Sequence, residues 1–310
     1  MTPKNESLIS GGAHLYVSSK KGDMPMMVRD LYRLDLPTIK LWDGKEWVKI
    51  SGISKKERSG TEVEILLRSG ERLSCSPELR LPTNKKVVEV RELKLGDKLK
   101  RVTLPEPKPV KSPKHIDSDL AWFIGLYLAE GSRSFDLKRS KNLDSLTGTI
   151  QIAGHVKEED RWIRVQKVTE SYGGSATRTI KGNKMDIRVY GKILHAFIQE
   201  FITGKIAKNK GINPIAWRYS NSFLKSLMLG YLNGDGHWDE QNKRWRLGFT
   251  RNYNLERDFR TACSRLDWNL KLLPSFSQFK GEKYPSFRGE IRMIKSNHFN
   301  VKDSTEIIDL

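Results

Sequence analysis

The feature that most constrains this chain is a short pattern that occurs twice, as "GLYLAEG" at 125–131 and "GYLNGDG" at 230–236. In each copy, a glycine is followed four positions later by a small residue, then by an acid and a second glycine. Residues four apart lie on one face of a helix. Small residues at that spacing allow two helix backbones to approach closely. We therefore expect two helices to cross at four small residues: Gly125, Ala129, Gly230 and Gly234.

The same crossing would bring the two acids, Glu130 and Asp235, to neighbouring helix ends. Two adjacent carboxylates repel each other unless a cation lies between them. Mg²⁺ prefers a few carboxylates together with water and phosphate oxygens. One copy alone is better explained as a buried helix packed on glycine, with a solvated acid at its end. Two copies in matching positions favour a paired acid site.

The glycine that follows each acid, Gly131 or Gly236, is predicted to end its helix in the left-handed conformation and turn the chain away.

The segments around the two copies follow a similar order, which indicates an internal repeat. After the helix that begins at Ser118, the pattern predicts a strand, a helix, a hairpin and a helix, at 147–154, 158–174, 175–191 and 192–204. After the helix that begins at Ser220, it predicts a strand, a helix and two strands, at 244–252, 254–268, 270–281 and 283–294. The second unit therefore lacks a final helix.

Residues 14–103 are predicted to form short strands and turns. "RSGER" joins two β-rich runs, and Asp43-Gly44 stands at the turn of a further hairpin. The stretch that follows, 102–119, is rich in proline and lysine, which is typical of a linker.

The charge of the chain predicts a polyanionic partner. Its 310 residues include 56 Lys and Arg against 37 Asp and Glu, a formal net charge of +19, and the excess is densest after Glu130. Each phosphate neutralised by Lys or Arg releases counterions. The alternative is a surface whose charge serves only solubility.

Other features of the composition favour an intracellular protein. The two cysteines, Cys75 and Cys263, form no metal-binding or disulfide framework, which suits a reducing compartment. No apolar run has membrane-spanning length, and no signal peptide begins the chain. We expect no membrane association and a cytoplasmic location. This expectation includes a protein that acts at the nucleoid or one that is encoded by a phage.

"FIGLYLAEG" and "MLGYLNGDG" resemble the two signature helices of single-chain LAGLIDADG homing endonucleases, within a match that covers about 118–295. The resemblance implies an α+β fold of two pseudo-symmetric αββαββα halves, at 118–210 and 211–295. In this family each half lays a curved antiparallel sheet into the major groove of double-stranded DNA. The resemblance also implies a monomer that makes double-strand breaks in a long target.

The same resemblance makes Glu130 and Asp235 ligands of Mg²⁺ or Mn²⁺, with two or three ions at the paired acids. Glutamate at the first site departs from the commoner aspartate. The family also uses a basic or amide residue near each metal. "NKGINP" then points to Lys210, with Lys205 and Lys208 as competitors, and an exposed loop lysine as the alternative.

Gln151 stands where relatives place a water-positioning amide, although an ordinary surface residue is the alternative. The matching position in the second half falls near Gly248. His237 is predicted to be a loop residue. The candidate bases of the second half are Lys280, Lys283 and Lys295.

Alternate residues of the predicted strands are expected to face DNA. In the first half these are Thr149, Gln151, Arg178, Lys184, Asp186 and Arg188. In the second half they are Arg244, Arg246, Arg251, Ser275, Ser277, Gln278, Lys280 and Arg288.

The remaining residues, 14–117 with 296–310 returning to pair, resemble an all-β Hint domain of an intein. Ala13 stands where a splicing Cys or Ser belongs, and alanine supplies no nucleophile. Leu79 stands three residues after Ser76 where histidine belongs, and leucine is neither acid nor base. We expect a Hint scaffold that has lost splicing, preceded by a tail at 1–13.

Three functions are therefore compared, with a homing endonuclease preferred. A non-cleaving LAGLIDADG protein that binds DNA or RNA, such as a maturase, is disfavoured by the presence of both acids. An intein splicing element is disfavoured because the nucleophile, the histidine and a closing His-Asn pair are missing.

Overall fold

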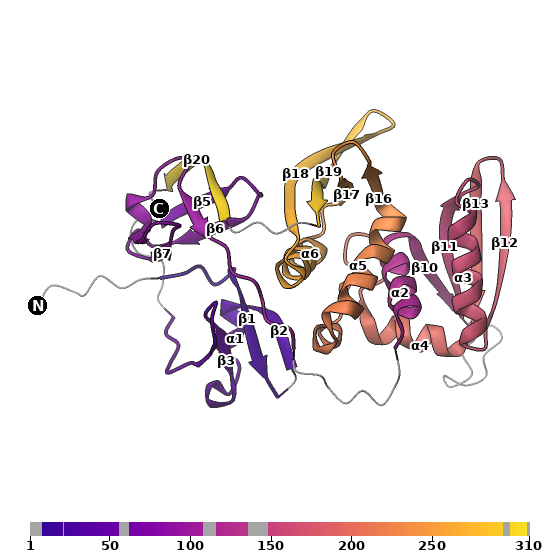
Figure 1. Cartoon of the computed structure of the whole chain (residues 1–310), viewed down its shortest axis with the longest axis horizontal. Helices are drawn as coiled ribbons and strands as arrows, with labels where there is room; N and C mark the ends of the chain where they lie inside the picture. Colours follow the sequence, from indigo (N-terminus) through magenta and orange to yellow (C-terminus); the bar gives the residue numbers. More distant parts are fainter. Residues whose placement is uncertain are drawn as a thin grey trace, which may run out of the picture. The chain divides into compact units, whose positions relative to one another are not determined.

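The computed structural model describes residues 8–20, 22–55, 62–107, 116–135, 148–293 and 298–308 (Figure 1). The chain forms two compact units. One consists of Glu106–Ala262 and Ser275–Arg288, and the other of Met1–Pro105, Cys263–Pro274 and Gly289–Leu310. The middle of the predicted linker, at 108–115, and the start of the predicted tail, at 1–7, lie outside the described residues. Within the described ranges, no helix has the length and apolar character needed to cross a membrane.

The first half of the repeat has the order αββαββα. Its elements are α2 (Ser118–Glu130), β10 (Gly131–Phe135), β11 (Gly148–His155), α3 (Glu159–Ser171), β12 (Ser175–Lys181), β13 (Lys184–Tyr190) and α4 (Lys192–Phe201). A short hairpin of β14 (Ile202–Thr203) and β15 (Gly211–Ile212) follows, and then a 3₁₀ turn at Pro214–Arg218.

The second half repeats this order as αββαββ. Its elements are α5 (Asn221–Asp235), β16 (Gly236–Asp239), β17 (Arg244–Thr250), α6 (Tyr253–Leu266), β18 (Asn269–Phe279) and β19 (Glu282–Arg292). The sheets have corresponding strand orders, β10-β11-β13-β12 and β16-β17-β19-β18. The chain is therefore a mixed α/β protein with an internal repeat. Strands β10 and β16 were not predicted, because each begins at the glycine directly after an acid.

The glycines that follow the acids do not adopt the predicted left-handed conformation. Gly131 has φ −82° and Gly236 has φ −92°, both extended. Each helix continues into a strand without a loop. A Cβ at Gly131 would overlap the Tyr127 ring, and one at Gly236 would overlap the Leu232 carbonyl oxygen. Glycine is needed there for space.

Side-chain alternation gives the first sheet one apolar face and one open face. Ile150 pairs with Val189 and Ile152 with Ile187, and all four side chains are buried. The residues between them face the other way, so that Gln151 pairs with Arg188 and Ala153 with Asp186. In Figure 1, α3 lies along β12 and β13.

The second compact unit consists mainly of short antiparallel strands. They are β1 (His14–Ser19), β2 (Gly22–Met27), β3 (Lys40–Trp42), β4 (Trp47–Lys49), β5 (Glu62–Leu67), β6 (Arg72–Cys75), β7 (Arg80–Pro82), β8 (Val87–Glu89), β9 (Lys98–Lys100) and β20 (His298–Ile308). The predicted hairpins β3–β4 and β5–β6 are confirmed, and Gly44 and Gly70 have positive φ at their turns. β20 pairs with β5 and β9.

Two details of this unit differ from the prediction. It contains a short helix, α1 (Val28–Leu31), and is therefore not entirely β. The end of the predicted tail is paired: Ile9 forms a bridge with Cys75, and the Ser10 amide donates to the Ser74 carbonyl. Residues 8–10 thus extend the sheet beside β6.

Candidate active site

The site begins with the close crossing of α2 and α5. A Cβ added at Gly125 would overlap the carbonyl oxygen of Leu227, and one at Gly230 would overlap that of Trp122. A Cβ at Gly234 would lie 2.6 Å from the Ala129 Cβ and 3.2 Å from the Glu130 Cγ. The four small residues therefore lie where the two backbones meet.

The crossing brings the two acids to adjacent helix ends. Burial raises the pKa of Glu130, and the charge of Asp235 raises it further. Asp235 is an exposed residue, but desolvation of its carboxylate by the neighbouring protein raises its pKa, against the opposing effects of a hydrogen bond with Tyr231 and the charges of Lys210 and Arg161. A site with these properties favours an added cation.

Lys210 lies between β14 and β15 and is only 4% exposed. Its Nζ donates to the carbonyl oxygens of Tyr127, at 3.0 Å, and Gly131. Burial lowers the pKa of Lys210 to about 8, although both acids oppose this shift. The side chain is therefore not that of an exposed loop lysine. Its two competitors, Lys205 and Lys208, are exposed.

A second buried cation, Arg161 of α3, was missed by the sequence reasoning. It is 9% exposed, and its Nη1 lies 2.7 Å from the Glu158 Oε2. Its Nη2 donates to the carbonyl oxygen of Asn233, near the end of α5. In the sequence, Arg161 follows three acids in an apparently solvated first turn, so no local signal marks it.

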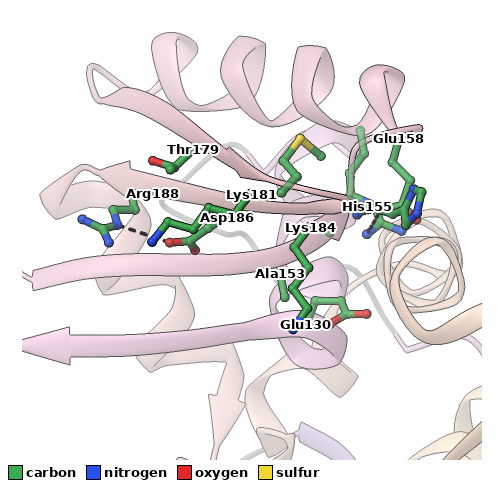
Figure 2. Close-up of a pocket in the computed structure, with 12 residues that line it drawn as sticks. Glu130, Ala153, His155, Glu158, Thr179, Lys181, Lys184, Asp186 and Arg188 are labelled. Atoms are coloured by element: carbon green, nitrogen blue, oxygen red, sulfur yellow. Dashed lines mark hydrogen bonds and ion pairs between the residues drawn. The ribbon is translucent and has the colours of Figure 1, made fainter.

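A groove of about 570 Å³ passes Glu130 and runs over the open face of the first sheet. Figure 2 shows Glu130 close to Ala153 and Lys184, with Asp186 and Arg188 further along the sheet. Three basic side chains of the sheet line this groove: Lys181, Lys184 and Arg188.

Gln151 lies on the open face of β11, where its Oε1 accepts a hydrogen bond of 3.5 Å from the Ser132 hydroxyl. The register also identifies its counterpart in the second half. Gly131 pairs with Ile152 and Gly236 with Leu247, so Gln151 corresponds to Arg246. The prediction that the matching position is near Gly248 is wrong by two residues.

Five of the six predicted DNA-facing residues of the first half share the open face by alternation: Thr149, Gln151, Lys184, Asp186 and Arg188. Within this set, Arg188 forms an ion pair with Asp186 at 3.4 Å. Arg178 was wrongly assigned to the set. It pairs with buried Ile187, forms an ion pair with Glu159 and lies 5.2 Å from the Trp162 ring, on the α3 side.

In the second half, Arg244 and Arg246 converge on one carboxylate. Asp239 Oδ2 lies 3.1 Å from Arg244 and 2.7 Å from Arg246, and its side chain is 9% exposed. Arg288 lies on the same face, because a Cβ at Gly248 would be 3.5 Å from its Cγ. His237 lies on β16, where it pairs with Arg246 of β17, so the prediction of a loop residue is wrong.

The remaining predicted residues do not share one face. Alternation along β18 places Ser275 and Ser277 on one side and Gln278 on the other. Lys280 lies in the turn after β18 with φ 50°, and Arg251 lies beyond β17, 5.9 Å from the Phe276 ring. Of the other candidate bases, Lys283 is exposed on β19, and Lys295 lies outside the described residues.

Across the described part of the chain, no group of three or more His, Cys, Asp and Glu side chains is arranged to hold a metal ion. The two carboxylates that the crossing brings together, Glu130 and Asp235, are the side chains that could hold a cation here. Mg²⁺ suits such a donor set, because it is commonly held by one or two carboxylates and keeps several waters.

No protein-family model matches the chain. It is 24% identical over 266 residues to the DNA-directed RNA polymerase subunit Rpo1C of Methanocaldococcus jannaschii, covering 74% of this chain and 29% of that protein. It is 27% identical over 154 residues to the replication factor C small subunit of the same organism, in a match that covers 44% of this chain and 8% of that protein. It is 26% identical over 193 residues to the iron-sulfur cluster assembly SufBD family protein Rv1461 of Mycobacterium tuberculosis, covering 61% and 20%. The chain thus spans less than a third of the length of these relatives.

Solved structures similar to the chain include a mesophilic variant of the homing endonuclease I-DmoI, with a TM-score of 0.38 and 12% identity over 56% of this chain and 88% of that one. Another is the N-terminal LAGLIDADG domain of DUF199/WhiA, with a TM-score of 0.35 and 11% identity over 60% and 80%.

Proposed function

We propose that the chain is a site-specific DNA endonuclease of the LAGLIDADG type, which hydrolyses both strands of a long target with Mg²⁺ or Mn²⁺. The observation that carries the proposal is the crossing at Gly125 and Gly230, which holds Glu130 and Asp235 at adjacent helix ends. Beside them lies an open sheet face with basic side chains. An acid pair next to a phosphate-binding surface suits phosphodiester hydrolysis.

In this proposal, Glu130 and Asp235 would hold the divalent ions, two or three in number. A bound divalent ion would supply Lewis acidity towards a phosphoryl oxygen and lower the pKa of a water. Gln151 is placed on the open face of β11 to orient a water. Lys210 keeps the end of α2 in place through the Tyr127 and Gly131 carbonyls, and its ammonium group adds positive charge beside the acids.

The curated relatives support a self-contained element. A polymerase subunit, a replication factor and an iron-sulfur assembly protein have different functions, yet each matches this chain over less than a third of its own length. Sequence shared with proteins of such different functions is expected to have a function of its own. We therefore assign the chain to an intein-type element. From the family resemblance and the composition, we further propose a monomer that acts inside the cell.

Within that element, 14–117 with 296–310 form a Hint-like scaffold without splicing chemistry. The methyl group of Ala13 supplies no nucleophile, and Leu79 packs against the apolar cluster around Val63 and Val90. The two LAGLIDADG halves are 118–210 and 211–295.

The test is a selection of cleaved duplexes from a randomised library, carried out with Mg²⁺, with Mn²⁺ and with Ca²⁺. Recovery of one family of cleaved sites with Mg²⁺ or Mn²⁺ supports the proposal. Binding of a preferred sequence without cleavage in either metal would instead establish a non-cleaving DNA-binding protein.

The open face of the first sheet is expected to dominate the salt dependence of DNA binding. The slope of log K against log salt is negative, and each phosphate contact adds about 0.9 to its steepness. A Lys184→Ala, Arg188→Ala double variant should therefore make the slope less steep by up to about 1.8. A Lys192→Ala, Lys225→Ala double variant removes the same charge from exposed positions of α4 and α5. Equal changes in slope for the two double variants, measured by fluorescence anisotropy, would contradict binding through this face.

A further inference from the structure

We infer that Arg161 is a positioning residue for Asp235, and that it does at the end of α5 what Lys210 does at the end of α2. This inference rests on the proposed function, because it assigns a second cation to the same acid site. Both helices end at this site, and the carbonyl groups at a helix C-terminus carry partial negative charge. Two such ends, each with a carboxylate, bring several negative charges together, and nearby positive charge offsets their repulsion.

At the end of α2, this charge comes from Lys210. Its Nζ contacts the carbonyls of Tyr127 and Gly131, which lie on either side of Glu130 in the sequence. The main chain of Lys210 is fixed in turn by Asn252. The side-chain amide of Asn252 donates a hydrogen bond of 2.7 Å to the carbonyl oxygen of Lys210. Asn252 immediately precedes α6, so the second half holds the cation that serves the first acid.

At the end of α5, the corresponding contact comes from Arg161. Its guanidinium group bridges the Glu158 carboxylate and the carbonyl of Asn233, two residues before Asp235. Glu158 is itself fixed, because its Oε2 accepts a hydrogen bond of 2.7 Å from the His155 amide. A planar guanidinium can hold both partners at once, which a lysine ammonium does less well.

Asn233 is held from a second direction. Its Oδ1 accepts a hydrogen bond of 2.8 Å from the Trp122 indole of α2. The last turn of α5 is therefore fixed to α3 through Arg161 and to α2 through Trp122. The first half thus holds the acid of the second half, while the described residues of the second half continue through β19 without a final helix or a buried lysine of this kind.

Arg164 provides a matched control on the same helix. Its Nη2 lies 2.7 Å from the Asp119 carboxylate, and its guanidinium lies 4.1 Å from the Trp122 ring. Like Arg161, it ties α3 to the crossing helices, but its ion pair lies at the start of α2. It contacts the face of the Trp122 ring, whereas the indole N–H of Trp122 makes the bond to Asn233.

The test compares Arg161→Gln, Arg161→Lys and Arg164→Gln by amide hydrogen exchange and by cleavage of a selected target at saturating DNA. Arg161→Gln is expected to speed exchange over 232–236, and Arg164→Gln over 118–122. Because a displacement of about 1 Å can cost about a hundredfold in rate, Arg161→Gln should cleave about ten- to a hundredfold more slowly even when DNA is saturating. Arg161→Lys should recover part of this loss, and Arg164→Gln should stay within about twofold of the wild type.

Suppose that Arg161→Gln exchanges faster over 232–236 and still cleaves at the wild-type rate. That result would overturn the inference, since Arg161 would then stabilise the helix end without serving the acid. Unchanged exchange would overturn it as well. If Arg161→Gln does not fold, Arg161→Lys decides the question. A cleavage rate of Arg161→Lys equal to that of the wild type would show that the guanidinium bridge is not needed, and would overturn the inference. If the wild-type protein itself does not cleave, the proposed function fails, and the exchange result alone decides whether Arg161 holds the end of α5.

Discussion

An Asp235→Asn protein is expected to bind its DNA target with nearly unchanged affinity and to make no double-strand break. Asparagine keeps the shape of the side chain but removes the charge that would hold a divalent ion. Affinity depends on the basic sheet faces, which the substitution leaves intact. The rate should fall at least about a hundredfold, the size of effect seen when one electrostatic stabiliser of a transition state is removed. Linearisation of a plasmid substrate and a gel-shift assay measure the two properties separately.

Glu130→Gln is expected to behave in the same way, since the two acids lie at equivalent helix ends. Asp160→Asn is the matched control. It removes one negative charge from the exposed first turn of α3 and should cleave normally. Full cleavage by Asp235→Asn would show that the acids are not the metal ligands, whatever the control does.

The crossing of the helices could be predicted from the sequence because its cause is local. Gly125, Ala129, Gly230 and Gly234 are spaced by one helical turn within each copy, and each helix ends at its acid. Alternation along β11 and β13 was equally accessible, because period-two patterns in continuous strands require only the neighbouring residues.

The errors arose where the answer depends on a partner distant in sequence. Without β16, which was not predicted, the counterpart of Gln151 was placed at Gly248, whereas the β16–β17 register gives Arg246. Arg178 belongs to the other face because Glu159 and Trp162 of α3 receive it there.

Ion pairs in which one partner is largely covered were also not predictable from the sequence. Arg161 and Asp239 look like ordinary surface charges in a chain with 56 basic residues. Their roles depend on Asn233, Arg244 and Arg246, which only the folded chain brings within reach. A composition that predicts DNA binding therefore conceals the few charges that hold the site together.

Gly230→Ala is expected to lose cleavage out of proportion to its loss of stability. Alanine is about 1 kcal/mol better than glycine in a helix, so the substitution would stabilise an unconstrained helix. Here the added methyl group would overlap the Trp122 carbonyl oxygen, a backbone atom that can move only with α2. Overpacking of this kind costs about 1–3 kcal/mol, so a lower thermal midpoint is expected.

The effect on cleavage should be larger because the same contact sets the separation of the two acids, and a shift of about 1 Å costs about a hundredfold in rate. Gly125→Ala should reproduce the result, since its methyl group would overlap the Leu227 carbonyl oxygen on the partner helix. Gly52→Ala is the control, because no atom lies within 4 Å of its added Cβ. Thermal midpoint and cleavage rate are measured for all three variants. If Gly230→Ala cleaves at the wild-type rate, the repeated glycines do not assemble the acid pair, and the duplication of the pattern needs another explanation.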